Sequence, residues 1–321
     1  MRWKFWLGIA VSLGLLALAF RGVHLDELGD SLRDVRLLWL VPVLLTIPVR
    51  FWLTAIRWQV LLRPVKRIGL HRLFAVTMIG FMANNILPAR MGELVRAYAL
   101  GKSESLSNSL SFATIVLERV FDGFTLLLFL VVGVLFLRPG PWIVWPAIAS
   151  FCLYLGVLGG LVWLRAGRGV GWLLGWLPGA VRVKVGELLD SFALGLDVLG
   201  DGRALAVSAG LSLAIWLVNV AGVWAMFAAC SLDLPPYAAF LVLALVALVL
   251  VLPSAPGYVG TFQAGTVAAL ALFSVPEATA LSLSLVYHAI NYVPITAAGL
   301  VYLASMNLTL GELRAAGKKA A

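Results

Sequence analysis

The sequence predicts an all-α, polytopic membrane protein. Of its 321 residues, 62% are hydrophobic and 12% are charged, and the mean hydropathy is +1.01. Apolar stretches recur along the whole chain, and several reach the roughly 20 residues that a helix needs to cross a bilayer. They do not alternate apolar with polar residues, as the strands of a membrane β-barrel would. These observations predict one integral membrane domain over residues 1–321.

The apolar stretches predict about six full spans and two re-entrant hairpins. Three stretches, near 73–88, 237–252 and 258–275, are too short for a comfortable crossing. We therefore expect hairpins over 73–107 and 237–275. The stretches that we expect to span lie near 4–20, 37–62, 112–137, 142–164, 205–230 and 279–305.

The first apolar stretch has two interpretations. Arg2 and Lys4 precede it and small residues, Ala17–Ala19, end it, which is also the pattern of a signal peptide. We expect an uncleaved first helix, with a signal peptide as the alternative.

The distribution of basic residues predicts that both termini lie in the cytoplasm. Lys and Arg collect in the cytoplasmic connections of membrane proteins. Here they dominate 63–72 and 165–203, whereas 21–36 mixes them with acidic residues. We therefore expect 63–72 and 165–203 on the cytoplasmic side and 21–36 on the outer side. The two hairpins are expected to open on opposite sides of the membrane. The net charge of +9 has the same explanation and does not indicate nucleic acid as a partner.

The connector 165–203 contains a predicted amphipathic helix. Arg182, Glu187, Asp190 and Asp197 fall between apolar residues that recur at helical spacing. We expect this helix either at the cytoplasmic membrane interface or packed against the bundle. Its apolar residues are Val181, Val185, Leu188, Leu189, Phe192, Leu196 and Leu199.

The two hairpin regions share a pattern that predicts an inverted repeat. "ILPARMGE" and "VLPSAPGY" place Pro88 and Gly92 at the same spacing as Pro253 and Gly257. Interrupted hydrophobic segments at corresponding positions of two halves are typical of transporters whose substrates bind near the midplane. Non-helical backbone at that depth has to be surrounded by protein or by a water-filled cavity. An ordinary pair of kinked helices is the alternative. The expected repeats cover about 37–164 and 205–305.

Three charged residues follow the first break and predict an anion site. Arg90, Glu93 and Arg96 are three apart and share a helical face with a net charge of +1. A helix that begins after the break adds free N–H groups and partial positive charge, and Arg binds phosphate in a bidentate manner. We expect Arg90 and Arg96 to bind a lipid phosphate, with Asn85 in the same site. We expect Glu93, Glu118 and Asp122 to hold these arginines or to meet an amine of the headgroup. The alternative is that Arg90, Glu93 and Arg96 pair with one another at the cytoplasmic surface.

Two carboxylates in the following span need cationic partners. Glu118 and Asp122 share a face at depths of roughly 10 and 16 Å, and an acid inside the membrane needs a partner. For Asp122 we expect an arginine of the first break (Arg90 or Arg96), or Arg50, which lies mid-span and has to face the interior. Such a pair is either part of the substrate site or purely structural.

For Arg57, the sequence predicts a position at the membrane interface, unlike the interior position expected for Arg50. Arg57 lies seven residues after Arg50 and shares its face. It lies near the inner end of its span, where the long side chain is expected to reach the interface.

The second half supplies uncharged polar groups. After the second break, Gly257, Gly260, Thr261 and Gln263 are expected to expose backbone N–H groups to the same headgroup. Three polar side chains of the last span share a face at i, i+3 and i+4 and are expected to line the same cavity, with a packing hydrogen bond as the alternative for the histidine. These side chains are His288, Asn291 and Tyr292.

Four stretches resemble the flippase-like family of the lysylphosphatidylglycerol synthase transmembrane region: "NNILPARMGELVRAYAL", "LERVFDGF", "LPSAPGYVGTFQAG" and "YHAINYVPITAAGL". The resemblance extends from the second span to about residue 305. It implies a multi-pass protein of the bacterial or archaeal cytoplasmic (inner) membrane that moves a lipid, or a lipid-linked sugar, between leaflets. Larger relatives add a soluble aminoacyl-transferase domain, which we expect this chain to lack. Many relatives carry a glutamate at the position of Gln263, and its absence here leaves an ion-coupled role in doubt.

We therefore predict a lipid translocase that is not driven by ATP and needs no cofactor or metal. Motifs for covalent catalysis, zinc hydrolysis and nucleotide binding are missing from the sequence. The expected substrate is an anionic or zwitterionic lipid, such as a phospholipid, an aminoacylated lipid or a polyprenyl-phosphate-linked sugar. A separate synthase or glycosyltransferase is a possible partner. The alternatives are a membrane component of a lipid or glycosyl transferase, a small-solute or ion transporter, and a structural partner of a synthase.

Overall fold

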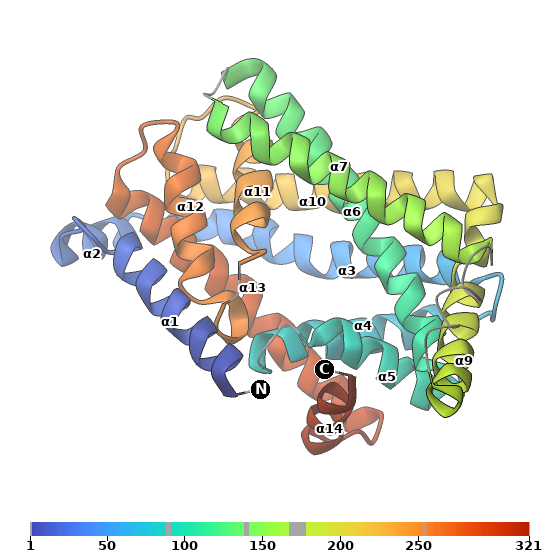
Figure 1. Ribbon diagram of the computed structural model, residues 1–321. Helices are drawn as coiled ribbons and strands as arrows, with labels where there is room; N and C mark the ends of the chain where they lie inside the picture. Colours follow the sequence, from blue (N-terminus) through green and yellow to red (C-terminus); the bar gives the residue numbers. More distant parts are fainter. Residues whose placement is uncertain (1, 88–90, 138–140, 167–177, 253, 321) are drawn as a thin grey trace.

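The structure is a computed structural model that describes residues 2–87, 91–137, 141–166, 178–252 and 254–320. These residues form helices and loops, with no strand among them, which confirms the predicted all-α polytopic fold. The α-helices are, in chain order, α1 (Arg2–Ala19), α2 (Leu25–Arg33), α3 (Leu40–Leu62), α4 (Leu70–Ile86), α5 (Gly92–Glu104), α6 (Asn108–Leu137), α7 (Pro141–Arg165), α9 (Gly179–Gly195), α10 (Gly202–Ala229), α11 (Ala238–Val249), α12 (Thr261–Ala271), α13 (Glu277–Ser305) and α14 (Leu310–Ala320) (Figure 1).

Five helices of the described chain are long and apolar enough to cross a membrane. They are α3, which the 3-10 turn η1 (Leu37–Trp39) extends at its start, and α6, α7, α10 and α13. The sequence predicts about six full spans, and the difference lies in the first helix. The described apolar part of α1 covers only Trp6–Ala19, and the chain then turns at Gly22, whose φ is +83°.

The two halves of the chain make matching helix contacts. At the centre, α3 packs along α10 with the opposite chain direction (Figure 1). On either side of this pair, α4 packs on α13 and α11 packs on α6. In the first half, the short helices α4 and α5 pack on each other, and α5 packs on α6. In the second half, α11 and α12 pack on each other, and α12 packs on α13. The helices α3, α4, α5 and α6 therefore have counterparts in α10, α11, α12 and α13.

Each half contains a break between its two short helices. At the first break, the Asn84 side chain accepts a hydrogen bond of 2.7 Å from the backbone N–H of Gly92 and so caps α5. The helices of this pair approach closely at Gly80, where a Cβ would collide with a side chain of α5. At the second break, Gly257 and Gly260 have φ values of +71° and +86°. These left-handed conformations favour glycine because it has no Cβ.

The mixed segment 21–36 and the predominantly basic segment 63–72 lie at opposite ends of the bundle. A backbone hydrogen bond of 2.8 Å from Arg36 to the end of α10, and contacts between α2 and α13, bring the mixed segment 21–36 to one end. At the other end, Glu104 forms ion pairs with Lys66 and Arg72. We call this second end the basic end. The separation agrees with the topology expected from the positive-inside rule.

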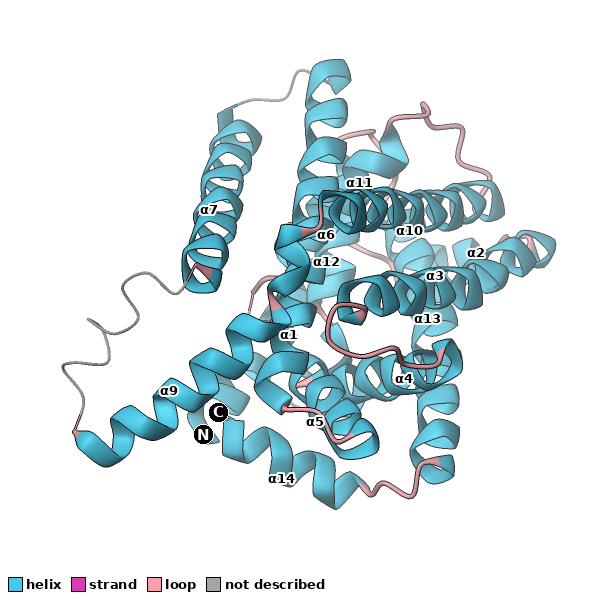
Figure 2. Ribbon diagram, turned by 90° about the vertical axis from the view of Figure 1, so that its right-hand side faces the viewer, coloured by secondary structure: helices cyan, strands magenta, loops and turns pink. Residues whose placement is uncertain are grey.

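The helix α9 of the connector packs against the bundle, which was one of the two expected arrangements. It contacts α6, and Gly195 approaches the Leu110 carbonyl so closely that a Cβ would collide. The Ser109 hydroxyl donates a hydrogen bond of 2.8 Å to the Leu188 carbonyl. Val181, at the other end of α9, remains exposed. The neighbouring helix α7 makes its main contacts with α6 and α9 and stands apart from the rest of the bundle (Figure 2).

The last helix, α14, is tied to α5 by a surface ion pair that predicts a pH dependence. Lys102 Nζ donates a hydrogen bond of 2.6 Å to Glu312 Oε1. This bond lowers the pKa of the Glu312 carboxyl and raises the pKa of Lys102. The contribution of Glu312 is therefore lost as pH falls through its lowered pKa, and that of Lys102 is lost as pH rises through its raised pKa.

We expect α14 to dock most firmly between these two limits, with a small effect because the pair is exposed. Hydrogen exchange of the α14 amides, corrected for intrinsic rates, measures this. Glu312→Gln is the control and should flatten the acid limb of the profile. An unchanged acid limb in that variant would contradict the assignment.

Candidate functional site

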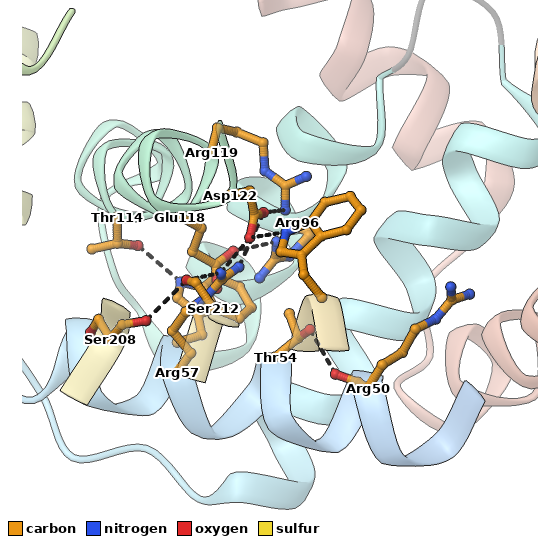
Figure 3. A network of polar contacts seen from close by, with 12 residues as sticks. Arg50, Thr54, Arg57, Arg96, Thr114, Glu118, Arg119, Asp122, Ser208 and Ser212 are labelled. Carbon is orange, nitrogen blue, oxygen red and sulfur yellow. Dashed lines mark hydrogen bonds and ion pairs between the residues drawn. The ribbon is translucent and has the colours of Figure 1, made fainter. Parts of the chain in front are cut away.

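A cluster of charged side chains lies buried where α3, α5, α6 and α10 meet (Figure 3). Arg57 of α3 donates hydrogen bonds to Asp122 of α6 at 2.5 Å and to Ser212 of α10 at 2.6 Å. The Trp216 indole N–H donates to the same Asp122 oxygen at 3.1 Å, and Arg119 Nη2 lies 3.3 Å from the other oxygen. The Arg57 side chain is 1% exposed and that of Asp122 is 10% exposed. The pair is therefore shielded from both lipid and water.

Glu118 brings a second buried arginine into this cluster. One of its oxygens accepts a hydrogen bond of 2.7 Å from Arg96 Nη1, and the other lies 3.8 Å from Arg57 Nε. The Arg96 guanidinium stacks on the Trp58 ring at 4.1 Å from the centroid. Trp58 is itself held by a hydrogen bond of 2.9 Å to Thr114. This cation–π contact helps to stabilise an arginine that is removed from water.

These pairings differ from those that the sequence predicts. In the described part of the chain, Asp122 pairs with Arg57 and Arg119, and it pairs with neither Arg96 nor Arg50. The expectation that Arg57 reaches the membrane interface is also wrong. Helices α6 and α10 supply acceptors beside the inner half of α3, so the guanidinium is satisfied inside the bundle without reaching water.

The arginines of this cluster keep several unsatisfied donors. Arg57, Arg96 and Arg119 face the carboxylates of Glu118 and Asp122, and the nearby carboxylate of Glu93 brings the formal charge to 3 − 3 = 0. Several buried nitrogen atoms have no hydrogen-bond partner among the described residues, namely Nε of all three arginines and Nη2 of Arg96. An unsatisfied buried donor costs about 1–3 kcal/mol. An anion would therefore be stabilised beside this cluster.

Glu93 lies close to the same cluster, in the first turn of α5. It is half-buried and interacts electrostatically with Arg96 and Arg119. Arg119 is the most accessible cation of the cluster, since its side chain is 40% exposed. Its guanidinium also interacts with Tyr258, which belongs to the second break. The cluster therefore connects the two halves of the chain.

Arg50 forms a separate cationic position in the middle of α3. Its Nη1 donates to Asn219 Oδ1 at 2.7 Å and its Nη2 donates to Asn291 Oδ1 at 2.8 Å, while the guanidinium lies 4.7 Å from the Phe51 ring centroid. The side chain extends away from the buried cluster (Figure 3). No carboxylate in the described ranges lies within the 4 Å of an ion pair. Neutral amides leave its charge uncompensated at a depth where an isolated charge is costly.

The two breaks meet inside the bundle. Asn85, in the last turn of α4, donates a hydrogen bond of 2.8 Å to the Thr296 hydroxyl of α13. The Tyr292 hydroxyl donates a hydrogen bond of 3.3 Å to the Asn85 carbonyl. Gly257 of the turn η4 (Pro256–Tyr258) packs against these same two residues, because a Cβ there would collide with the Tyr292 ring. At Asn85 and Gly257 the two breaks are thus packed against α13 and against each other, as non-helical backbone inside a membrane protein requires.

A chain of hydrogen bonds fixes the second break. The Gly260 N–H donates to Gln263 Oε1 at 2.8 Å, and Gln263 Nε2 lies 2.9 Å from His288 Nδ1. His288 Nε2 lies 2.8 Å from the Gly257 carbonyl. A carbonyl only accepts hydrogen bonds, so Nε2 carries the proton and Nδ1 accepts from the Gln263 amide. The Gly260 N–H and the Gln263 side chain, which the sequence predicts as headgroup contacts, are therefore already engaged with the protein.

Replacing Gln263 by leucine is expected to lower the free energy of unfolding by about 1–3 kcal/mol. The change leaves the Gly260 N–H and His288 Nδ1 buried without partners, and unsatisfied buried groups cost free energy of that order. Unfolding of the purified protein in mixed micelles measures the loss. Thr266→Val is the control, because Thr266 is equally buried on α12 but, among the described residues, its hydroxyl bonds only to the Phe262 carbonyl of its own helix. Equal losses in both variants would contradict the role of the hydrogen-bonded chain.

Helix α1 packs against the second break. The Ser12 hydroxyl accepts a hydrogen bond of 2.7 Å from the Ala255 N–H. Gly8 packs against the Ser254 carbonyl and Gly260 packs against the Ser12 carbonyl, so closely that a Cβ on either glycine would collide. The backbone of the break is therefore shielded by α1 as well as by α13.

Comparison with known proteins places this arrangement in a family. The family model described as the lysylphosphatidylglycerol synthase TM region matches residues 5–299. The chain belongs to this family. A UPF0104 membrane protein of Methanothermobacter thermautotrophicus is 25% identical over 95% of this chain and 96% of its own length. The glycosyltransferase AglD of Haloferax volcanii is 29% identical over 93% of this chain, which covers 54% of AglD. No solved structure matches the chain.

In this member of the lysylphosphatidylglycerol synthase TM region family, most of the predicted site residues fall into three groups. The buried cluster contains Arg96, Glu118 and Asp122, with Glu93 beside it. Arg50 and Asn291 form the second group. Arg90, Pro88 and Pro253 lie outside the described residues. The third group surrounds the junction of the breaks and contains Asn85, Gly257, Thr261, Gln263, His288 and Tyr292.

Sequence reasoning missed several residues of this family member's site. Asn219 is the partner of Arg50, and its signal is a lone amide in the middle of an apolar span. Ser212 and Trp216 bind the buried pair from the same helix, four residues apart. Serine and tryptophan are common in membrane helices, so their spacing alone carries no signal.

Proposed function

We propose that this family member moves a phosphate-bearing lipid between the leaflets of the membrane. The headgroup would occupy the polar interior beside the two breaks, and the acyl chains would remain in the bilayer. The substrate class is an anionic or zwitterionic lipid, which includes phospholipids, aminoacylated lipids and polyprenyl-phosphate-linked sugars. Phospholipids, aminoacylated phospholipids and polyprenyl-phosphate-linked sugars carry a phosphate, for which arginine is the matching cationic partner.

The observation that carries this proposal is the environment of Arg50. Its guanidinium is held at the middle of α3 by two amide oxygens and has no carboxylate partner in the described chain. The buried cluster adds arginine N–H groups without hydrogen-bond partners among the described residues, about 10 Å away along α3 if measured from Arg50 to Arg57. Cations without matching anions at membrane depth are expected to serve a ligand or a transport path.

The matching contacts of the two halves support an inverted repeat. In this interpretation, α3 to α6 correspond to α10 to α13, and the pairs α4–α5 and α11–α12 are re-entrant hairpins that open on opposite sides of the membrane. The connector that contains α9 joins the repeats on the cytoplasmic side. Substrate sites of inverted-repeat transporters lie where such broken helices meet. The junction of Asn85 with Gly257 and Tyr292 would then mark the centre of the path.

The proposed location is the cytoplasmic membrane of a bacterium or archaeon. The chain is a multi-pass membrane protein, and relatives of it are archaeal membrane proteins. The concentration of basic residues at one end supports a cytoplasmic position for that end.

Reconstitution tests the proposal. Purified protein is inserted into liposomes that contain lipids with a fluorescent label, and a membrane-impermeant quencher reports their leaflet, with and without a proton gradient. We expect lipids with a phosphate headgroup to change leaflet faster than in liposomes without protein. No acceleration for any phosphate lipid under either condition would contradict the proposal.

A second candidate function is a membrane component of glycosyl transfer. The observation that favours it is the similarity to AglD, a protein named as a glycosyltransferase, of which this chain covers 54%. Incubation of the purified chain with a nucleotide-activated sugar and a polyprenyl phosphate distinguishes the two. Formation of a glycosylated lipid would favour transfer, whereas leaflet exchange without product favours translocation.

A further inference from the structure

A cavity of about 830 Å³ opens at the basic end of the bundle, apart from the buried cluster. It lies between the end of α3, the end of α7 and the start of α10, and the 3-10 turn η3 (Asp197–Gly200) forms one of its walls. Two smaller cavities share lining residues with it. One, of about 410 Å³, extends it toward α9, and the other, of about 330 Å³, extends it along the end of α3. Its size is that of a site for a small molecule or headgroup.

The charged lining of this cavity is suited to an anion. Arg63, Arg165 and Arg203 line it from three different elements, together with Asp197 and Asp201. Within the described ranges, these arginines form one ion pair, a long contact of 3.9 Å between Arg165 and Asp197. Asp201 caps α10, because its side chain accepts hydrogen bonds from two backbone N–H groups. The arginines therefore remain available for an anionic ligand.

The remaining lining of the cavity is apolar. Val60, Ala204 and Val207 line the main cavity, and Leu164 and Leu194 line its extension toward α9. Helices α7 and α10 both border this space, although the main contacts of α7 are with α6 and α9. Val207 and Leu194 are exposed. A ligand here would meet cations at one end and an exposed apolar surface at the other.

We propose that this cavity binds the headgroup of an anionic phospholipid from the leaflet at the basic end, with its phosphate on the three arginines and its acyl chains between α7 and α10. A free anion would use the arginines but not the apolar surface. An apolar ligand would leave the arginines unused. A phospholipid satisfies both, which is why the assignment is to a membrane lipid.

The position of the cavity connects it with the buried cluster. Val60 lies one helical turn from Arg57 on α3. On α10, Val207 precedes Ser208, and Ser212, which binds Arg57, follows one turn later. The lipid in this cavity would therefore lie at the entrance to the buried charges. A role in loading the substrate rests on the proposed function, whereas the binding of the lipid does not.

Native mass spectrometry of the purified protein tests this proposal. The protein is titrated with phosphatidylglycerol, phosphatidylcholine and soluble glycerol phosphate. We expect phosphatidylglycerol to bind more tightly than the other two. The triple variant Arg63→Gln/Arg165→Gln/Arg203→Gln should bind phosphatidylglycerol about 100-fold more weakly, because each basic residue beside an anionic headgroup contributes roughly a fivefold factor.

Two further variants separate this cavity from general surface charge. Val207→Trp fills the cavity and keeps the arginines, so it should also weaken binding of phosphatidylglycerol. Arg182→Gln/Lys184→Gln/Arg314→Gln removes the same charge from exposed positions outside the cavity lining and should keep the wild-type affinity. Three results would overturn the proposal: wild-type binding by the cavity variants, an equal loss in the control, or equal affinity for glycerol phosphate. Leaflet exchange is measured in a separate assay. If no exchange were found there, the proposed function would fail, but the lipid-binding result would still stand.

Discussion

Replacing Glu118 by leucine is expected to lower the free energy of unfolding by about 3–5 kcal/mol, the largest stability effect that the structure predicts. Glu118 is fully buried and lies between Arg96, at 2.7 Å, and Arg57, at 3.8 Å. Its removal takes away the one carboxylate that is hydrogen-bonded to Arg96 in the described chain, and it leaves three arginines facing Asp122 and the half-buried Glu93. Reversible unfolding of the purified protein in mixed micelles measures the loss.

Two comparisons make this prediction specific. Glu104→Leu is the same change in a surface pair with Lys66 and Arg72, and it should cost at most about 1 kcal/mol. The double variant Glu118→Leu/Arg96→Met removes one charge of each sign, and it should recover much of the loss because no charge is left unpaired. If the double variant is as unstable as the single one, the destabilisation does not come from an unpaired arginine.

Replacing Arg50 by glutamine is expected to slow leaflet exchange of phosphate lipids at least about tenfold, since charge-assisted hydrogen bonds contribute roughly 1.5–3 kcal/mol. The fold should tolerate this change. Arg50 has no carboxylate partner in the described chain, so no buried anion is left behind, and glutamine can still donate a hydrogen bond to Asn219 or Asn291.

Arg119→Gln and Lys184→Gln serve as references in the same liposome assay. Arg119 is the accessible cation beside the second break, and its loss should also slow exchange. Lys184 is an exposed residue of α9, and its loss should leave the rate unchanged. Wild-type rates for Arg50→Gln, at an equal amount of folded protein, would show that Arg50 is a structural residue.

Much of the fold is predictable from the sequence because its signals are local. The apolar stretches mark the helices, and the spacing of Pro88 with Gly92, and of Pro253 with Gly257, places both breaks where helices end. The sixth expected span, α1, has 18 residues, and its described apolar part, Trp6–Ala19, is shorter than the other five. An apolar stretch near the limit for crossing has its ends set by turns, such as the one at Gly22, and not by composition alone.

The partners within the site are not predictable in the same way. Arg57 pairs with a residue 65 positions away, and Arg50 pairs with one 169 positions away. Periodicity shows which face of a helix a residue occupies, but the partner depends on how helices pack. The position of Arg57 near a helix end favours snorkelling, whereas the acceptors on α6 and α10 hold it inside. Likewise, His288 and Tyr292 share a helical face, but the sequence does not reveal their partners. His288 bonds to the second break at Gly257, and Tyr292 bonds to the first break at Asn85.

The ratio of two initial rates tests the central claim most directly. A fluorescent phospholipid and a fluorescent glucosyl diacylglycerol, which has a polar headgroup without phosphate, are compared in liposomes with wild-type protein and with Arg50→Gln. The proposed function predicts that wild-type protein moves the phospholipid faster and that the ratio falls toward one in the variant. Equal rates for both lipids in the wild type, or an unchanged ratio in Arg50→Gln, would contradict a path built on arginine–phosphate recognition.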